Sequence, residues 1–287
     1  MIAEKPAQLA KPITADVNQR RQSSAATAGL ESTLTMIVHS SDYVEYCRET
    51  ALQLHDLHDL ALRGRGQKRI THAVCQRIID EVDLGPGDDL VDIGCGDGTL
   101  LRMAIQAGAH SARGLQATAE EAQLLCDLGL PVLQALSHSL PVGTASASVV
   151  VCNSVLLVIP TTLIQPTLLE ISRIAKPGAR VFLGEIPMVP GPEAEPHFAS
   201  EWQALAYAYQ KHGLRSWAGM LRRMARSKWT GEPLVVHDCS SIAFHAQADE
   251  FVAMVEKVGL TLVRFWQHEY VKNRNNYLFR KPASTGL

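Results

Sequence analysis

The sequence of 287 residues has no excess of charge of either sign. Lys and Arg total 27 and Asp and Glu total 29, so the formal net charge is −2 at pH 7. Nucleic-acid-binding proteins usually have a strongly basic balance and disordered acidic chains a strongly negative one, so neither class describes the whole chain. With 46% hydrophobic residues, the composition is typical of a globular protein with a sizeable core.

Metal-binding and redox patterns of cysteine are also absent from the sequence. None of the six cysteines forms a Cys-x-x-Cys pair or a tight cluster, which argues against a zinc ribbon or a redox dithiol, so we predict no metal site. The first 35 residues lack the apolar segment of a signal peptide and contain Glu4 and Asp16, which transit peptides avoid. We therefore expect reduced thiols and a cytoplasmic protein.

The longest stretch without charge runs from Leu128 to Leu169, which contains no Asp, Glu, Lys or Arg. Its apolar core at 148–159 is about a dozen residues long, and a membrane-spanning helix needs about 20. Asn153 lies inside this core and Pro160 ends it. A parallel strand buried on both faces explains the pattern better than a membrane span does.

From residue 88 onward, short apolar runs alternate with helical patterns. We predict strands at 89–94, 112–116, 132–135, 148–153, 180–185, 260–267 and 276–281. We predict helices at 68–82, 99–107, 118–126, 163–174 and 249–258. This alternation indicates β-α-β units and an α/β fold, in which helices cover both faces of a parallel sheet.

The sequence predicts four regions. A tail rich in Ala, Gln, Ser and Thr occupies 1–35, and N-terminal helices follow at 36–82. The α/β core comprises 83–185 and 247–282. A helical cap at 186–246, with an aromatic helix and a basic helix, is inserted late in the core.

One motif carries the chemistry. Asp92-Ile-Gly-Cys-Gly-Asp-Gly98 has the spacing Gly-x-Gly-x-Gly, with an acid two residues before the first glycine. Glycines here allow a tight turn from strand to helix and let a ligand lie on the backbone beside free N–H groups. The dinucleotide fingerprint has the different spacing Gly-x-Gly-x-x-Gly, which disfavours a nicotinamide-dependent oxidoreductase.

The motif resembles the first motif of the class I S-adenosylmethionine-dependent methyltransferases. Later segments resemble the same family in order and spacing, at 149–156, 171–178, 251–260 and 277–282. The resemblance covers roughly 67–185 and 247–282. It implies a Rossmann-like seven-stranded sheet with the last strand antiparallel, an N-terminal helical extension, and a helical cap after the fifth strand.

The resemblance also implies the site that holds S-adenosylmethionine and its product S-adenosylhomocysteine. Asp92 would lie near the ammonium group of the cofactor, and Asn153 and Ser154 would line the junction between methyl donor and acceptor. The residues that would pack against the methionine and ribose are Gly94, Cys95, Gly96 and Gly98.

Two positions differ from the family. Gln116 stands where an acid usually accepts hydrogen bonds from the ribose, and Leu136, with Ser137 beside it, stands where an Asp usually binds the adenine amino group. A charge-assisted hydrogen bond contributes about 1.5–3 kcal/mol against about 1 kcal/mol for a neutral one. We therefore predict weaker cofactor binding than in the family.

The acceptor site is expected under the cap. Candidate general bases are His197, His237, His245 and Glu185. Candidate acceptor-contacting aromatic residues are Tyr43, Tyr46, Trp202, Tyr207 and Trp217. Each of these residues has a purely structural alternative, such as packing, a helix cap or a surface ion pair.

The segment 211–228 contains six basic residues and no acid. Its apolar residues recur at helical spacing, so it is a basic amphipathic helix. Such a helix binds a membrane surface, an anionic ligand or a protein partner. The alternative is a solvated helix that covers the active site with its apolar face.

These observations favour an S-adenosylmethionine-dependent methyltransferase acting on a small molecule of the natural-product, quinone, lipid or sugar type. The first alternative is a cofactor-binding but non-catalytic regulatory or scaffold protein, which Gln116 and Leu136 favour. A second alternative is the oxidoreductase. A nucleic-acid methyltransferase is disfavoured because no Asn/Asp-Pro-Pro-Tyr/Phe motif stands at 152–155.

Overall fold

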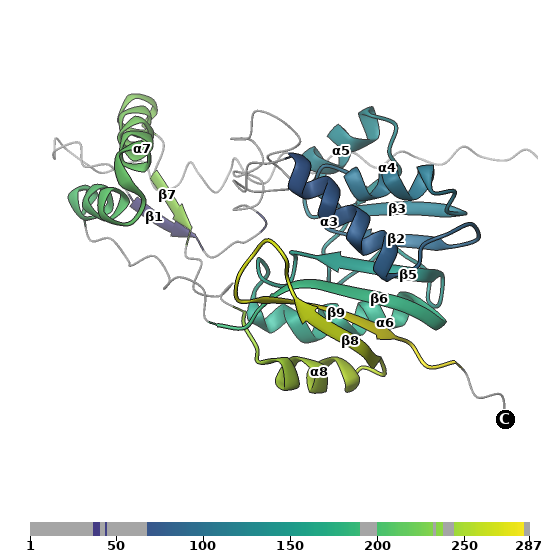
Figure 1. Cartoon of the computed structure of the whole chain (residues 1–287). Coiled ribbons are helices and arrows are strands. Elements are labelled where there is room, and N and C mark those ends of the chain that lie inside the picture. The colour runs from purple at the N-terminus through teal and green to yellow at the C-terminus, as the bar shows by residue number, and fades with distance from the viewer. Residues whose placement is uncertain are drawn as a thin grey trace, which may run out of the picture. The chain divides into compact units, whose positions relative to one another are not determined.

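The computed structural model describes residues 37–40, 44, 68–189, 200–231, 234–237 and 244–283 (Figure 1). The chain forms two compact units. One includes Ala199–Leu234, and the other comprises Val38–Phe198 and Val235–Leu287. The larger unit contains the sheet and the glycine motif.

The larger unit is built on a seven-stranded sheet with the order β4-β3-β2-β5-β6-β9-β8. Its strands are β2 (Asp89–Ile93), β3 (Ser111–Gln116), β4 (Val132–Gln134), β5 (Ala147–Asn153), β6 (Ala175–Pro187), β8 (Thr261–Gln267) and β9 (Arg274–Arg280). The pairs from β4 to β6 are parallel, whereas β9 is antiparallel to both β6 and β8. The predicted Rossmann-like sheet with an antiparallel last strand is confirmed.

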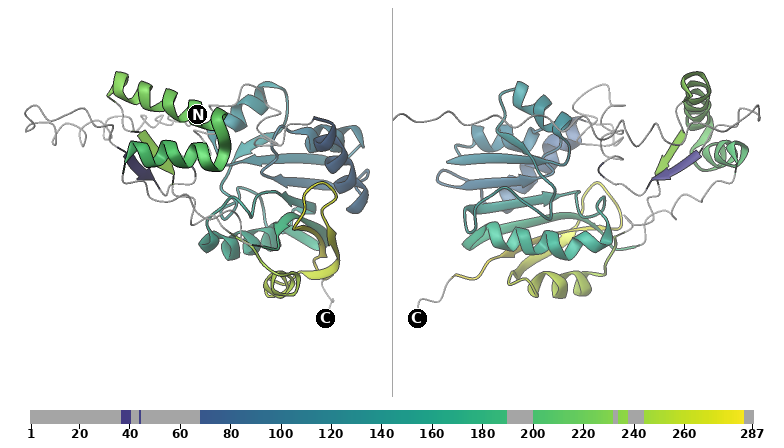
Figure 2. Two further views of the ribbon diagram at one scale, coloured as in Figure 1. Left: turned by 60° about the vertical axis from the view of Figure 1, so that its left-hand side comes forward. Right: turned by 180° about the vertical axis from the view of Figure 1, so that it is seen from behind.

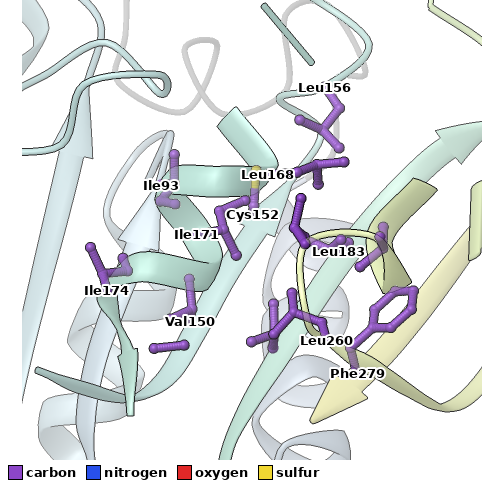
Figure 3. Close-up of a cluster of buried hydrophobic side chains, with 14 of the residues drawn as sticks. Ile93, Val150, Cys152, Leu156, Leu168, Ile171, Ile174, Leu183, Leu260 and Phe279 are labelled. Carbon is purple, nitrogen blue, oxygen red and sulfur yellow. The ribbon is translucent and has the colours of Figure 1, made fainter. Parts of the chain in front are cut away.

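Helices cover both faces of this sheet (Figures 1 and 2). They are α3 (Lys68–Glu81), α4 (Thr99–Gln106), α5 (Ala119–Asp127), α6 (Ile164–Ile174), which follows the 3₁₀ turn η1 (Thr161–Leu163), and α8 (Ala248–Glu256). Side chains of α6 and α8 belong to one buried cluster, and those of α3, α4 and α5 to another. Figure 3 shows the first cluster, in which Leu168 and Ile171 of α6 meet Val150 and Cys152 of β5.

The uncharged stretch contains the central strand β5. Val149 and Val151 join the cluster on the α3 and α4 face, whereas Val150 and Cys152 join the cluster on the α6 and α8 face. All four side chains are 0% exposed. The prediction of a parallel strand buried on both faces is therefore confirmed. In the part of the chain that the structure describes, no helix is both long and apolar enough to span a membrane.

The smaller unit contains α7 (Glu201–Thr230). Gly213 interrupts this helix with φ 79° and ψ −174°, a conformation that is nearly restricted to glycine. The interruption separates an aromatic segment from a basic segment, so the two helices predicted in the cap are both present. The aromatic Trp202 lies in the first segment and is 79% exposed.

Two short strands correct the predicted regions. β1 (Ile37–Ser40) and β7 (Leu234–His237) form a two-stranded sheet, within stretches that we predicted to be helical. Four residues are too few to distinguish the period of a strand from that of a helix. Between residues 41 and 67 of the predicted N-terminal helices, the structure describes only Val44, which is helical.

The helix α3 is part of the larger unit, although we predicted it as part of an N-terminal extension. Ile78 and Val82 at its end are buried in the same cluster as Leu101 of α4. The extension and the α/β core therefore share one hydrophobic cluster at this point.

Candidate functional site

The glycine motif forms the turn between β2 and α4. Gly94, Gly96 and Gly98 have φ values of 72°, 55° and 73°, in the left-handed region that favours glycine. The N–H groups of Gly94 and Cys95 both donate to the carbonyl oxygen of Leu115, at 2.8 and 3.2 Å. A Cβ atom on Gly94 would lie 2.4 Å from Val155 Cγ2. The turn therefore requires glycine for both its backbone angles and its space.

Asp97 fixes the start of α4. Its Oδ1 accepts a hydrogen bond from the N–H of Thr99 at 2.9 Å, and its carbonyl oxygen accepts one from Arg102 Nη2 at 2.9 Å. The side chain of Asp97 is buried. Sequence reasoning did not single out this residue, although its position inside the motif was a signal.

A cavity lies at the carboxyl ends of β2, β5 and β6, where it is also lined by residues of α3. The predicted site residues that line it are Asp92, Gly94, Cys95, Gly96, Asn153, Ser154 and Glu185. These residues come from the ends of strands that are separated in sequence but adjacent in the sheet. The structure thus brings most of the predicted cofactor residues and one candidate base together.

The electrostatics of the cavity centre on Asp92. Burial, together with the nearby charge of Asp97, raises the pKa of this carboxyl from 3.8 to about 7. A buried carboxyl of this kind is readily ionised by a cation placed beside it. Asp92 is therefore suited to a ligand with a positive group.

Two buried oxygen atoms in the cavity lack hydrogen-bond partners among the described residues. They are Asn153 Oδ1 at the end of β5 and Thr71 Oγ1 on α3, and both residues line the cavity. Leaving a buried polar atom without a partner costs about 1–3 kcal/mol. A ligand that donates hydrogen bonds would remove this cost. Sequence reasoning did not identify Thr71, because a single Thr in a helical pattern carries no motif.

The side chain of Cys95 is buried and packs against Gly114 of β3. A Cβ atom on Gly114 of β3 would lie 2.6 Å from its Sγ. Burial raises the pKa of the Cys95 thiol well above its usual range, so the thiol is neutral. Cys95 therefore contributes packing with its side chain and turn geometry with its backbone.

Four of the predicted cofactor residues are not among those that line the cavity, namely Gly98, Gln116, Leu136 and Ser137. Gln116 is buried at the end of β3, and its Nε2 donates to the carbonyl oxygen of Gly96 at 2.8 Å. Ser137 and Thr167 share a hydrogen bond of 2.9 Å between their hydroxyl groups. The Gln116 side chain is thus hydrogen-bonded to the backbone of the glycine turn.

Glu185 lines the cavity at a bulge in β6. The register of the β6–β9 pair shifts between Leu183 and Ile186, and Glu185 has a φ of 62°. Its Oε2 accepts a hydrogen bond from Arg274 Nη1 at 2.6 Å, and its Oε1 lies 3.8 Å from His268 Nε2. Both Glu185 and His268 are buried and line the cavity.

Of the three predicted histidines, the structure describes the side chain of His245 alone. His197 lies outside the described residues, and His237 ends β7 with a side chain that is also not described. His245 is exposed. Among the described residues, the cavity is lined by His268, which sequence reasoning did not identify. No motif surrounds His268, and only its position just after β8 could have suggested it.

The predicted acceptor-contacting aromatic residues are only partly described. Tyr43 and Tyr46 lie outside the described residues, and Tyr207 lies in α7 with a side chain that is not described. Trp202 is exposed and Trp217 is partly buried, both in α7 of the smaller unit. Among the described residues, no group of three or more His, Cys, Asp or Glu side chains is arranged to hold a metal ion.

The central part of the sheet matches a known protein family in sequence. Residues 91–183 match the family model described as a methyltransferase domain. This segment runs from β2 into β6 and contains the glycine motif. Residues 91–183 are therefore similar to a methyltransferase domain. No curated protein sequence matches the chain significantly.

Solved structures share the fold at low sequence identity. An S-adenosylmethionine-dependent methyltransferase of Leishmania major has a TM-score of 0.54 at 8% identity, over 83% of this chain and 82% of that chain. One chain of the complex between the Haloferax volcanii Trm112 methyltransferase activator and a protein described as a methyltransferase has a TM-score of 0.52 at 14% identity, over 85% and 99%.

The [4+2]-cyclase SpnF has a TM-score of 0.50 at 14% identity, over 88% of this chain and 100% of that chain. At these identities the likeness is one of fold. Because one of the similar proteins is named a cyclase, the fold alone does not identify the reaction.

The methyltransferase domain implies S-adenosylmethionine as the cofactor. The residues present fit this molecule, since a buried carboxyl at Asp92 and an unpartnered oxygen at Asn153 suit a ligand with an ammonium group. Gly94 and Gly96 of the glycine turn line the cavity. When bound, the cofactor supplies an electrophilic methyl group.

Proposed function

We propose that the protein is an S-adenosylmethionine-dependent methyltransferase that acts on a small molecule, of the natural-product, quinone, lipid or sugar type. The observation that carries the proposal is the burial of the polar groups around the cavity. Asp92 and Glu185 are each 4% exposed, and His268 is 5% exposed. A small molecule can reach such groups, whereas a folded macromolecule would need a wide groove.

The residues around the cavity bind and orient the reactants. The glycine turn and Asp92 would hold the cofactor, and Asn153 and Ser154 line the same cavity. The apolar face of α3 excludes water from the cavity through Ile70, Val74 and Ile78. Alignment of two bound reactants and exclusion of water contribute most of the rate enhancement of a displacement on an activated donor.

Calorimetric titration tests the cofactor assignment directly. S-adenosylmethionine and S-adenosylhomocysteine are each expected to bind with 1:1 stoichiometry, and NAD is expected to give no heat of binding. The wild-type protein is then incubated with S-adenosylmethionine and a panel of small acceptors, and formation of S-adenosylhomocysteine is measured. Binding of NAD alone would refute the proposal.

A second candidate function is that of a cofactor-binding protein without catalytic activity. It is favoured by Gln116, whose amide group is bonded to the carbonyl oxygen of Gly96 and which stands where the family has an acid. The two candidates differ in one measurement. A non-catalytic protein would bind S-adenosylmethionine but would form no S-adenosylhomocysteine with any acceptor of the panel.

Location and partners remain part of the proposal. We infer a cytoplasmic protein from the sequence, and we infer that the basic segment 211–228 contacts an anionic ligand or a membrane surface. Arg222, Arg223, Arg226 and Lys228 are all exposed on α7, which supports a surface role. The cavity and its chemistry do not depend on this inference.

A further inference from the structure

We propose that α7 binds the surface of a membrane containing anionic lipids, through one face of the helix that follows Gly213. This interfacial face comprises Leu214, Leu221, Ala225 and Trp229. The inference rests on the part of the proposed function that concerns partners and is independent of methyl transfer. It commits that part to a single partner, a lipid surface.

The interfacial face lies on one side of the helix. An α-helix has 3.6 residues per turn, so Leu214 and the positions 7, 11 and 15 residues after it fall within an arc of about 80°. All four side chains are exposed. Met224 and Ser227 lie on a different side of the same helix and are 4% and 8% exposed. The helix is therefore buried along one side and presents an apolar face on another.

The interfacial face exposes large apolar side chains. The exposed fractions are 67% for Leu214, 37% for Leu221 and 92% for Trp229. Single exposed apolar residues are common on protein surfaces, whereas several large ones in one stripe mark an interaction site. An exposed indole suits the membrane interface in particular, because its ring is apolar and its N–H can stay in contact with water or headgroups.

Basic side chains border the interfacial face. Arg222 and Arg226 are exposed and lie about 60° and 100° around the helix from the centre of the face. Neither guanidinium group has an ion-pair partner among the described residues. No Asp or Glu occurs between Glu201 and Glu232. This part of α7 is therefore complementary in charge to the negative headgroups of a bilayer.

The combination of charge and apolar surface favours a lipid surface over a soluble anion. A soluble anion is bound by donors that converge on it, whereas these arginines border an exposed apolar stripe about 22 Å long. A bilayer interface offers negative headgroups and an apolar layer to the same helix. Helices with Arg on one side and Trp and Leu on the other bind membranes in this way.

Vesicle flotation of the full chain tests the role of the apolar residues. The wild-type protein is expected to float with vesicles of phosphatidylserine and phosphatidylcholine and not with phosphatidylcholine alone. Leu221→Ser and Trp229→Ser should each lower the partition coefficient on the anionic vesicles by about tenfold, because each removes an apolar side chain that would be buried in the interface. Binding unchanged in both variants would overturn the proposal.

The matched control for these variants is Trp202→Ser. Trp202 is also exposed, at 79%, but it belongs to the segment of α7 that precedes Gly213. Its variant should bind vesicles like the wild type, and a loss equal to that of Trp229→Ser would overturn the assignment of the face. All three variants should keep the circular dichroism of the wild type and its affinity for S-adenosylhomocysteine, because the substituted side chains are exposed.

Fluorescence quenching tests the position of Trp229 with a conservative variant. Brominated phosphatidylcholine in anionic vesicles should quench the tryptophan emission of the wild-type protein. Trp229→Phe keeps an aromatic side chain and should still float, but it should lose most of this quenching. Equal quenching in the two proteins would show that Trp229 does not enter the bilayer and would overturn the proposal.

Competition with glycerophosphoserine distinguishes a membrane from a soluble anion. This molecule is the headgroup of phosphatidylserine without its acyl chains. An excess of it is expected to leave the wild-type protein on the vesicles, since it offers no apolar layer to the interfacial face. Displacement of the protein would show that the headgroup alone is recognised and would overturn the membrane contact.

Failure of this inference can be distinguished from failure of the proposed function. If the protein binds S-adenosylmethionine and does not float with anionic vesicles, the membrane contact is wrong and the methyltransferase proposal stands. If it floats as expected and binds neither S-adenosylmethionine nor S-adenosylhomocysteine, the membrane contact stands and the methyltransferase proposal fails.

Discussion

At the scale of single residues, Gly94 is the position where backbone angle and space act together. Gly94→Ala would place a methyl group 2.4 Å from Val155 Cγ2 at a φ of 72°. We expect a loss of about 1–3 kcal/mol in the free energy of unfolding and no detectable binding of S-adenosylhomocysteine. Urea denaturation and calorimetry measure the two effects.

The matched control for this substitution is Gly85→Ala. Gly85 has no positive φ, and a Cβ atom there would meet nothing within 4 Å. Its free energy of unfolding should be unchanged or raised by about 0.4–1 kcal/mol, with normal cofactor binding. Equal losses in the two variants would contradict the strain argument.

The raised pKa of Asp92 makes the free energy of unfolding depend on pH. Its pKa is raised from 3.8 to about 7 in the folded protein. Between about pH 4 and 7 the folded state therefore holds a proton that the unfolded chain has released, so this residue makes stability fall as pH rises through that window. Asp92→Asn should remove a slope of about 1 kcal/mol per pH unit. Denaturation at four pH values from 4.5 to 7.5 measures it.

The control for this measurement is Asp127→Asn, which removes an exposed carboxylate of α5. It is expected to keep the slope of the wild type. A constant difference between wild type and Asp92→Asn across the pH range would show that Asp92 is not the source. The slope would also disappear if a bound cation already held Asp92 in its ionised form, so the measurement is made without ligand.

The sequence predicted residues of the site where a motif or a strand end marked them. Asp92, the glycines and Asn153 follow from the end of a buried strand, because the carboxyl ends of parallel strands share one edge. Gln116 was predicted to accept hydrogen bonds from the ribose, and this stays a prediction. The structure adds that its Nε2 donates to the carbonyl oxygen of Gly96. Thr71, His268 and Arg274 depend on packing between elements distant in sequence, which no local pattern reports.

At the scale of elements, the predicted strands and helices of the core are all present, because the buried parallel strands are long apolar runs and the helices between them have clear periodicity. The two elements that were missed, β1 and β7, have four residues each. Their pairing depends on a contact between residues almost 200 positions apart, roughly from 40 to 234. A hydrophobic pattern of four residues does not indicate which distant strand the segment pairs with.

The basic segment of α7 predicts an electrostatic interaction. If it contacts an anionic surface, the protein should float with vesicles of phosphatidylserine and phosphatidylcholine at low salt and not at high salt. The double variant Arg222→Gln/Arg226→Gln should lose about 2 kcal/mol of that binding energy, at about 1 kcal/mol per basic residue. Lys257→Gln/Lys272→Gln, at exposed positions of the larger unit, is the charge-matched control. Absence of the wild-type protein from the floated fraction would refute membrane contact.

At the scale of the whole molecule, cofactor binding should stabilise the fold. A ligand that binds only the folded state adds about 2.7 kcal/mol at a concentration of 100 Kd. For a domain of this size we expect S-adenosylhomocysteine to raise Tm by about 5–10 °C. NAD at the same concentration should leave Tm unchanged, and an equal shift with NAD would contradict the site described here. Differential scanning calorimetry measures both.

The position of β9 in the sheet has a consequence for the synthesis of the protein. Residues Arg274–Arg280 come last among the strands, yet they lie between β6 and β8, and Tyr277 and Phe279 are 0% exposed. On the ribosome, the chain must therefore be translated past Arg280 before the sheet can close. Until then the backbone edge of β6 has no partner strand on that side, and an unpaired edge is a template for aggregation. A stalled or truncated chain that ends before Arg274 would carry the complete glycine motif and still expose this edge.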